Sequence, residues 1–372
     1  MMHWLRFLVY RLTLALLRLV PQGRGRGYRL VILKLDRLGD AALALGAVRL
    51  LVREFGARET LLIVSTVAEP LFIREFPEVD LLVMPPFCER FWPDFVKTML
   101  RSAPQLRSIK ADHLVCLRHQ ASDYLHAIAA LIQVRQVHAT QWNKSWEHVC
   151  LSYPTDKRAP YPEQVAEGCL ELEAHRRMAQ DVLGRPVANS DILPSIAFSP
   201  VERGSTLLVC PVTGSAIRQY RPVQLAKAVE FFLRTAPGMH VTFCIPPGMD
   251  RTPWDQALKD AGIALGVDWV QPENLEALLQ VISGARVVLA SDSAPAHLAV
   301  AMNKPGVFVL GGGHYGMFAP WRRSALQVWL NHPESCYQCQ WNCVHPEPIC
   351  ITQIDPLSIT ASMQEVYAAG EA

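Results

Sequence analysis

The chain has 372 residues, of which 50% are hydrophobic and 19% charged, and this length predicts two domains rather than one. The apolar content excludes a disordered chain, and 10 cysteines are too few for a disulfide scaffold. The net charge of +2 provides no basic field for nucleic acid, so we expect no nucleic-acid partner. Residues 1–35 carry seven basic side chains and no acidic one, and subtracting seven from +2 leaves the remainder at −5.

Residues 1–27 form the first predicted segment, a basic amphipathic helix followed by a flexible linker. Arg11 and Arg18 interrupt its apolar stretch, which is too short for the about 20 residues of a membrane span and too charged for a signal peptide. The pattern predicts a helix on an anionic membrane surface, and therefore a cytoplasmic protein held peripherally at the inner face of the cytoplasmic membrane. Packing on the protein's own body or on a partner is the alternative, because the same pattern serves both. The apolar face consists of leucines at helical spacing: Leu5, Leu8, Leu12, Leu16 and Leu19.

From Tyr28 onward, short apolar strands alternate with helical segments, which predicts two α/β halves with parallel sheets covered on both faces. A ligand site is expected in the cleft between the halves, at the carboxyl ends of their strands. The expected domains are residues 28–190, residues 191–355 and a C-terminal helix at residues 356–372. The expected strands are 29–35, 60–65, 80–84, 112–117, 206–210, 240–245, 285–290 and 306–310, with helices over 40–55 and 163–183.

The first motif that could carry chemistry runs from Asp36 to Asp40, between a strand and a helix. Asp40 is expected to open the helix, and Asp is a favourable N-cap. A carboxylate that faces a cleft can also act as a general base, and the positive end of the helix would keep it ionised. From these residues alone, the cap is favoured over the base.

The second motif surrounds Asp292, where a buried strand leads into Ser293 and a new helix. Free N–H groups and the helix dipole at such a position suit a diphosphate. His297 follows within the same helix. The structural alternatives are caps for Asp292 and Ser293 and a buried core histidine for His297. The combination of strand, Asp-Ser, helix start and histidine favours an anion site.

Together the two motifs resemble those of the heptosyltransferase-type glycosyltransferases, glycosyltransferase family 9. The resemblance covers the chain from about Tyr28 to the end, and its second motif continues through Leu298-Ala299 to Lys304-Pro305. It implies a GT-B fold, with two Rossmann-like domains that face each other across a cleft. It also implies an enzyme that transfers a sugar with inversion from a nucleotide-diphosphate sugar. ADP-heptose is the typical donor, and a lipopolysaccharide core or another cell-surface glycan or glycolipid is the typical acceptor.

The resemblance also assigns roles to individual residues. Asp40 matches the catalytic base, and closure of the two halves would bring it to the donor. Arg218 stands where the family usually has Lys, Ala294 replaces a Gly and Tyr220 a Trp, differences that bear on the exact donor. Such chemistry requires no cofactor. The residues that match the donor site are Thr213, Gly214, Ser215, Arg218, Asp250, Asp292, Ser293, Ala294 and His297.

The cysteines fall into two groups. Six are scattered, several within apolar strands, and are expected to be buried reduced thiols: Cys88, Cys116, Cys150, Cys169, Cys210 and Cys244. The other four have the spacing C-x2-C-x3-C-x6-C: Cys336, Cys339, Cys343 and Cys350. Because no secretion signal is recognised, a reducing compartment is expected, and the spacing favours a structural zinc or iron site over disulfides. Free or redox-active thiols are the alternative.

Three other functions are compatible with part of these observations. They are a GT-B sugar-nucleotide epimerase, a protein heptosyltransferase of the autotransporter type, and a non-catalytic assembly subunit organised by its metal. The signature at Asp36 and Asp40 and the membrane-seeking N-terminus favour sugar transfer over epimerisation, because an epimerase has no need of a lipid surface.

Overall fold

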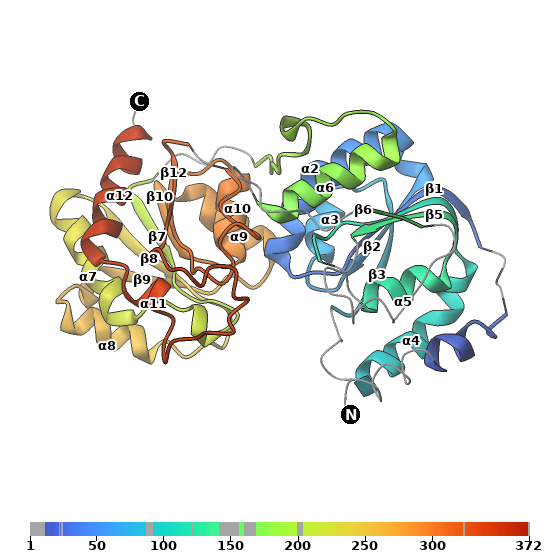
Figure 1. Ribbon diagram of the computed structural model, residues 1–372. Coiled ribbons are helices and arrows are strands. Elements are labelled where there is room, and N and C mark those ends of the chain that lie inside the picture. The colour runs from blue at the N-terminus through green and yellow to red at the C-terminus, as the bar shows by residue number, and fades with distance from the viewer. Residues whose placement is uncertain are drawn as a thin grey trace. The chain divides into compact units, whose positions relative to one another are not determined.

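A computed structural model describes residues 12–21, 23, 25–86, 92–120, 123–140, 156–159, 169–198, 204–322 and 324–370. The chain divides into two compact units. Unit 1 comprises Met1–Val165 and Leu170–Pro194, and unit 2 comprises Ala166–Cys169 and Ser195–Ala372. Each unit contains a six-stranded sheet with helices on both faces (Figure 1). The predicted α/β class is therefore confirmed.

The sheet of unit 1 has the order β3-β2-β1-β4-β5-β6, and all its strand pairs are parallel. The order reverses direction between β1 and β4, and ligands of open α/β sheets bind at the carboxyl ends of the strands at such a point. β1 is central, so Val31, Ile32 and Leu33 are buried on both faces of the sheet. The strands are β1 (Gly27–Lys34), β2 (Thr60–Ser65), β3 (Asp80–Met84), β4 (Lys110–Cys116), β5 (Gln133–Thr140) and β6 (Asp156–Ala159).

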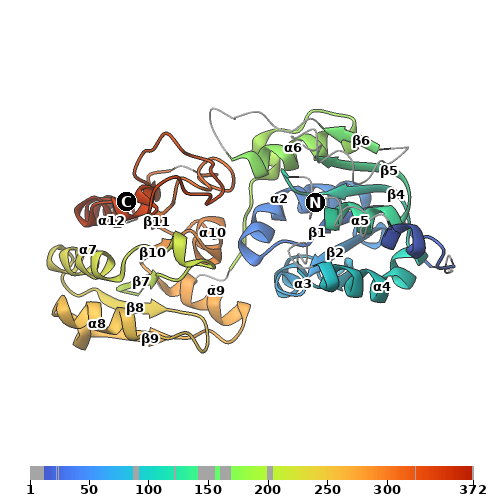
Figure 2. The ribbon, with the colours of Figure 1, turned by 60° about the horizontal axis from the view of Figure 1, so that its bottom comes forward.

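Two layers of helices cover this sheet. α2 and α6 pack together on one face, and α4 and α5 on the other (Figures 1 and 2). Gly46 allows α2 to approach the turn at Ile192 closely, because a Cβ at position 46 would lie 2.0 Å from the Ile192 carbonyl oxygen. The helices are α2 (Leu38–Phe55), α3 (Glu69–Glu75), α4 (Trp92–Ser108), α5 (Asp123–Leu131) and α6 (Leu170–Leu183).

The sheet of unit 2 has the order β12-β11-β10-β7-β8-β9 and is also parallel. Numbered from β7, it repeats the strand order of unit 1, so its point of reversal lies between β7 and β10. The strands are β7 (Thr206–Cys210), β8 (His240–Cys244), β9 (Val267–Val270), β10 (Val287–Ser291), β11 (Gly306–Val309) and β12 (Gln327–Leu330).

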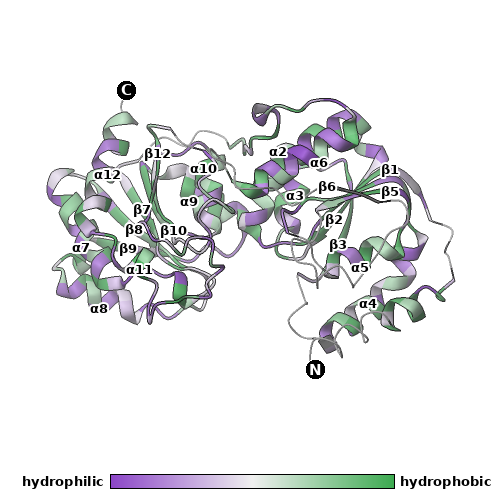
Figure 3. Ribbon diagram, viewed as in Figure 1, coloured by the Kyte–Doolittle hydropathy of each residue, from purple (hydrophilic) through white to green (hydrophobic). Residues whose placement is uncertain are grey.

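The core of unit 2 lies between this sheet and the helices around it. α7, α8 and α12 form one layer, and α9 and α10 belong to the other (Figure 1). In both units the central strands are hydrophobic, whereas the outer helices alternate hydrophobic and hydrophilic faces (Figure 3). The helices are α7 (Pro222–Thr235), α8 (Thr252–Asp260), α9 (Leu275–Gly284), α10 (Ala294–Ala301), α11 (Ile349–Thr352) and α12 (Pro356–Ala369).

The N-terminal helix is described from residue 12 to residue 17, and it lies beside α4 (Figures 1 and 2). Leu14 and Leu17 are 3% and 2% exposed and join the hydrophobic core of unit 1. The opposite side exposes Leu12, Leu16 and Leu19, at 62%, 64% and 77%. The alternative of packing on the protein's own body therefore holds for one face of this helix. Leu5, Leu8 and Arg11 lie outside the described residues.

Two features of these elements differ from the expectations. α2 begins at Leu38 instead of Asp40, because Arg37 takes the extended N-cap conformation. Four strands were not predicted: β5, β6, β9 and β12. β5 is a polar sequence, QVRQVHAT, and β9 and β12 have only four residues each, so none shows a long apolar run. In the described part of the chain, no helix is long and apolar enough to cross a membrane.

Candidate functional site

In unit 1 the candidate site is the turn between β1 and α2. Asp40 is the third residue of α2 and lies in its first turn, where the helix dipole favours a negative charge. The expectation that Asp40 opens the helix as its N-cap is wrong, because Arg37 takes that position without a side-chain hydrogen bond. Asp40 is partly exposed, whereas Asp36 is buried. The main-chain oxygen of Asp36 accepts a hydrogen bond of 2.6 Å from Ser65 Oγ, which fixes the turn to β2.

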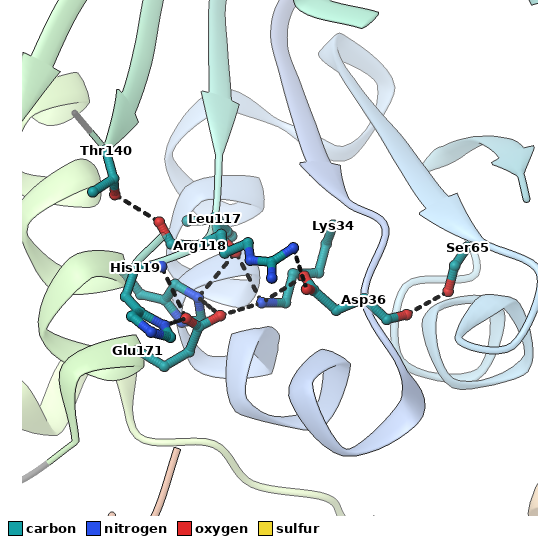
Figure 4. Close-up of polar contacts among 9 residues, drawn as sticks. Lys34, Asp36, Ser65, Leu117, Arg118, His119, Thr140 and Glu171 are labelled. Carbon is teal, nitrogen blue, oxygen red and sulfur yellow. Dashed lines mark hydrogen bonds and ion pairs between the residues drawn. The ribbon is translucent and has the colours of Figure 1, made fainter. Parts of the chain in front are cut away.

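A buried network of charged side chains lies beside this turn and includes Asp36 (Figure 4). Lys34 Nζ lies 3.0 Å from Asp36 Oδ2 and 2.5 Å from Glu171 Oε1, and it donates a hydrogen bond of 2.8 Å to the Leu117 carbonyl oxygen. Glu171 Oε2 accepts from both the main-chain N–H and Nδ1 of His119, at 2.9 and 2.5 Å. The network joins the ends of β1 and β4 to the first turn of α6, and so it fixes the backbone that leads to Asp40.

The charges of this network support one another. Burial alone lowers the pKa of Lys34, but the carboxylates of Asp36, Glu171 and Asp40 together raise it above its usual value. Burial alone raises the pKa of Glu171, but Lys34, His175 and His119 outweigh it and hold that pKa well below its usual range. Lys34 and Glu171 are therefore both ionised at neutral pH, and the positive charge of Lys34 acts on Asp40.

In unit 2 the candidate site surrounds Asp292, which is 3% exposed and follows β10. Three cationic or polar side chains converge on its carboxylate. His314 Nδ1 lies 3.1 Å from Oδ2, Arg218 Nη1 lies 3.6 Å from Oδ2, and His297 Nε2 lies 3.8 Å from Oδ1. Burial alone raises the pKa of Asp292, but these histidine contacts hold it far below its usual range. The carboxylate is therefore ionised at neutral pH.

His297 has one defined tautomer in this arrangement. Trp321 Nε1 can only donate, and it lies 3.1 Å from His297 Nδ1, so Nδ1 is the acceptor and Nε2 carries the proton toward Asp292. The side chain of His297 is buried, as the structural alternative expected, but it faces Asp292 rather than the apolar core alone. Ser293 is the N-cap of α10 without a side-chain cap, because its Oγ donates to the Ser291 carbonyl oxygen at 3.0 Å.

The structure brings only some of the other predicted donor residues to this cluster. Arg218 also donates to the Asp292 carbonyl oxygen at 3.5 Å, and Ala294 is the first residue of α10. Thr213, Gly214 and Ser215 form the turn after β7, which Ser291 joins through a 3.1 Å hydrogen bond to the Pro211 carbonyl oxygen. Asp250 is fully exposed in the turn after β8, where its carboxylate accepts from the Thr252 N–H and the hydrogen bonds lower its pKa.

The four clustered cysteines lie in a segment of little regular structure, residues 336–350, which we call the Cys-rich segment. Cys350 is buried, and Cys336, Cys339 and Cys343 are partly exposed. In the part of the chain that the structure describes, no group of three or more histidine, cysteine or acidic side chains is arranged to hold a metal ion. Cys116, Cys169, Cys210 and Cys244 are buried free thiols, and Cys88 and Cys150 lie outside the described residues.

Sequence reasoning missed two parts of these sites. The first is the pair of Lys34 and Glu171, which are 137 positions apart in the sequence. A lysine inside the apolar run of β1 was a usable signal for a buried charged partner. Three consecutive glycines precede His314 in the loop after β11, at the carboxyl edge of the sheet. This pattern was a second usable signal.

Comparisons with known proteins connect these sites with a family. The sequence model of glycosyltransferase family 9 (heptosyltransferase) matches residues 252–345, which include β10, Asp292, His297 and His314. The matched residues, 94 of 372, are similar to this family. This match confirms the predicted resemblance over these residues and supports the predicted enzyme class, a glycosyltransferase. Among curated proteins, no sequence matches the chain.

Three solved structures share the fold of this chain. E. coli heptosyltransferase WaaC with ADP is 13% identical, with a TM-score of 0.65, over 91% of this chain and 99% of that one. E. coli ADP-heptose lps heptosyltransferase II is 14% identical, with a TM-score of 0.64, over 92% and 100%. The iron-containing dodecameric glycosyltransferase TibC from enterotoxigenic E. coli H10407 is 13% identical, with a TM-score of 0.55, over 93% and 78%. The predicted GT-B fold is thereby confirmed.

Proposed function

We propose that the protein transfers a heptose from ADP-heptose, with inversion, to a lipopolysaccharide-type or other cell-surface glycan. One observation carries the proposal. A buried, ionised Asp292 is held by Arg218, His297 and His314 beside the start of α10, at the point where the strand order of unit 2 reverses. The helix start and Arg218 are suited to a diphosphate. The family match over residues 252–345 supports the reaction class, and the solved heptosyltransferases with the same fold support the donor.

In this proposal the two units have separate tasks. Unit 2 binds the nucleotide diphosphate, and Arg218 stabilises the negative charge that develops on the leaving group. Asp40 of unit 1 removes the proton of the acceptor hydroxyl, and its carboxylate interacts electrostatically with the buried Lys34. Each of these steps uses side chains of the chain itself.

A screen of nucleotide sugars tests the donor. Thermal unfolding is measured with ADP-, GDP- and UDP-sugars, because a ligand that binds only the folded state raises the transition temperature. We expect the largest shift with an ADP-sugar and a much smaller one in the Arg218→Ala variant. Donor consumption without an acceptor would instead indicate an epimerase, and equal shifts with all three nucleotides would contradict the assignment of ADP.

We also propose that the exposed face of the N-terminal helix binds an anionic membrane surface. Leu12, Leu16 and Leu19 lie on one side of the helix, away from the buried Leu14 and Leu17, so the fold itself does not use them. Exposed basic side chains also occur in the turn after this helix and on α4, the helix beside it: Arg18, Lys97 and Arg101. Apolar side chains flanked by cations are typical of helices that lie in a membrane interface.

Replacing Leu12, Leu16 and Leu19 together by Gln is expected to abolish binding to anionic liposomes while the fold is retained. Deletion of residues 1–27 is a poorer test, because it also removes Leu14 and Leu17 from the core. Cosedimentation with liposomes measures the effect, and binding by the unaltered protein should weaken with salt. Ile73→Gln on α3, where Ile73 is 51% exposed, is the matched control. Equal binding by the triple variant would refute the proposal.

We propose further that Cys336, Cys339, Cys343 and Cys350 bind one structural zinc or iron ion. Burial raises the pKa of the Cys350 thiol, a hydrogen bond with the Gly312 backbone lowers it, and the charges of the other three cysteines raise it. The described thiols are not arranged as a ligand set, so binding would draw them together. Iron is one candidate because TibC, which has the same fold, is described as iron-containing.

Elemental analysis of protein purified without added metal is expected to find about one zinc or iron ion per chain, as a closed four-cysteine site would bind. Cys339→Ser should lower this content, whereas Cys210→Ser, which replaces a buried thiol at the end of β7, should leave it unchanged. Less than half an equivalent in the unaltered protein would contradict the metal site.

A further inference from the structure

The loop that follows β11, residues 310–316, brings His314 to the edge of the Asp292 cluster. His314 Nδ1 lies 3.1 Å from Asp292 Oδ2, and because a carboxylate only accepts, Nδ1 is the donor. In the described chain, Nε2 of the same ring has no hydrogen-bond partner, and the side chain is 22% exposed. His314 is therefore oriented by a buried carboxylate on one side, while its other ring nitrogen is available to a ligand.

The Cys-rich segment holds the backbone of this loop. The main-chain N–H of Gln338 donates to the Gly312 carbonyl oxygen at 2.8 Å, and that of Gln340 donates to the Gly313 carbonyl oxygen at 3.3 Å. These two bonds attach the segment to the residues directly before His314.

Two aromatic rings of the Cys-rich segment also rest directly on the loop. A Cβ at Gly311 would lie 2.2 Å from Trp341, and one at Gly312 would lie 2.4 Å from Tyr337, so only glycine permits this approach. The Trp341 ring meets the His314 ring edge to face, with centroids 5.3 Å apart and an angle of 78°. Trp341 therefore restrains both the backbone and the side chain of His314.

We propose that His314 contacts the diphosphate of the donor through Nε2, and that the Cys-rich segment positions it through Trp341. This inference rests on the proposed donor-binding function of unit 2. A carboxylate that accepts from one ring nitrogen orients the imidazole and stabilises its doubly protonated form when the other nitrogen meets an anion. With Asp292 at Nδ1, a phosphate oxygen at Nε2 completes such an arrangement.

The test is the affinity for ADP, measured by calorimetry, in the variant His314→Asn. The asparagine amide can keep the hydrogen bond that Nδ1 makes to Asp292 but has no group at the place of Nε2. We expect ADP to bind about 10- to 100-fold more weakly, as for the loss of one charge-assisted hydrogen bond. His240→Asn, at the exposed start of β8, should bind ADP like the unaltered protein. If His314 has only a structural role, His314→Asn should bind ADP with native affinity. That result would overturn the proposal.

A double-mutant cycle tests the part played by the Cys-rich segment. If Trp341 acts through His314, Trp341→Ala weakens ADP binding, and the double variant binds no more weakly than His314→Asn alone. Additive losses would overturn the positioning role. Circular dichroism and the unfolding temperature establish that each variant is folded at the temperature of the titration. If the unaltered protein fails to bind ADP, the proposed function falls, whereas native ADP affinity in His314→Asn removes this inference alone.

Discussion

Replacing Asp40 with asparagine is expected to reduce sugar transfer by about 10²- to 10⁴-fold, the usual contribution of a general base. Asparagine has nearly the shape of aspartate but cannot take a proton from the acceptor hydroxyl. Because Asp40 belongs to unit 1 and the proposed donor site to unit 2, the affinity for ADP should remain nearly unchanged. The loss would therefore lie in kcat and not in the KM for the donor.

The position of Asp40 allows a sharp control for this experiment. Asp94 is also an acidic residue in the first turn of a helix of unit 1, α4, so Asp94→Asn removes a comparable interaction with a helix dipole. Such an interaction contributes about 0.3–1 kcal/mol to stability, which both variants would lose. Only Asp40→Asn should lose activity. Near-native turnover in Asp40→Asn would show that Asp40 serves the helix and not the reaction.

Replacing Lys34 with methionine is expected to lower the free energy of unfolding by about 3–5 kcal/mol, as is usual when one partner of a buried ion pair is removed. The side chains of Asp36 and Glu171, the two carboxylates beside Lys34, are 5% and 0% exposed. Neither carboxylate can therefore turn to water when Lys34 is replaced. Urea unfolding at pH 7, followed by circular dichroism, measures the loss. Lys97→Met, on the exposed face of α4, is the control, and equal midpoints for the two variants would contradict the role of the network.

The same network predicts how stability depends on pH. The pKa of Glu171 is lowered in the folded protein, so its stabilisation is present above the ordinary value of 4.5 and is lost as the pH falls through the folded value. The pKa of Lys34 is raised, so its stabilisation is present below 10.5 and is lost as the pH rises through the folded value. Stability from this pair is thus constant between these limits. Glu171→Gln should flatten the acid side of the profile, and an unchanged acid slope would refute this assignment.

The parts of the fold that could be predicted are those written in consecutive residues. β2 and β3 match the expected ranges because each is an uninterrupted apolar run between turns. β5 was missed because its polar residues suggest a surface, and only its place in the sheet between β4 and β6 makes it a strand. The start of α2 was misplaced by two residues because Arg37 is not a typical N-cap residue.

In the candidate sites, too, the residues that could be predicted are those close together in the sequence. Asp292 and His297 are five positions apart, and their motif placed both at the carboxyl end of one strand. The histidine that binds Asp292 most closely, His314, comes from another loop, and Glu171 reaches Lys34 from a distant helix. The N-terminal leucines show a further limit, because helical spacing could not distinguish the face that packs on unit 1 from the face that remains exposed.

The strictly parallel pairing of the strands also has a consequence for how this protein folds. Parallel neighbours cannot be joined by a hairpin, so every ladder in the described sheets closes over a crossover connection. β1, for example, gains its second neighbour only with β4, after residues 35–109 have been made. During synthesis its apolar edge therefore remains open for a large part of unit 1. Such non-local pairing slows folding and leaves aggregation-prone intermediates exposed. We therefore expect a high yield of native protein to depend on chaperones or on slow expression.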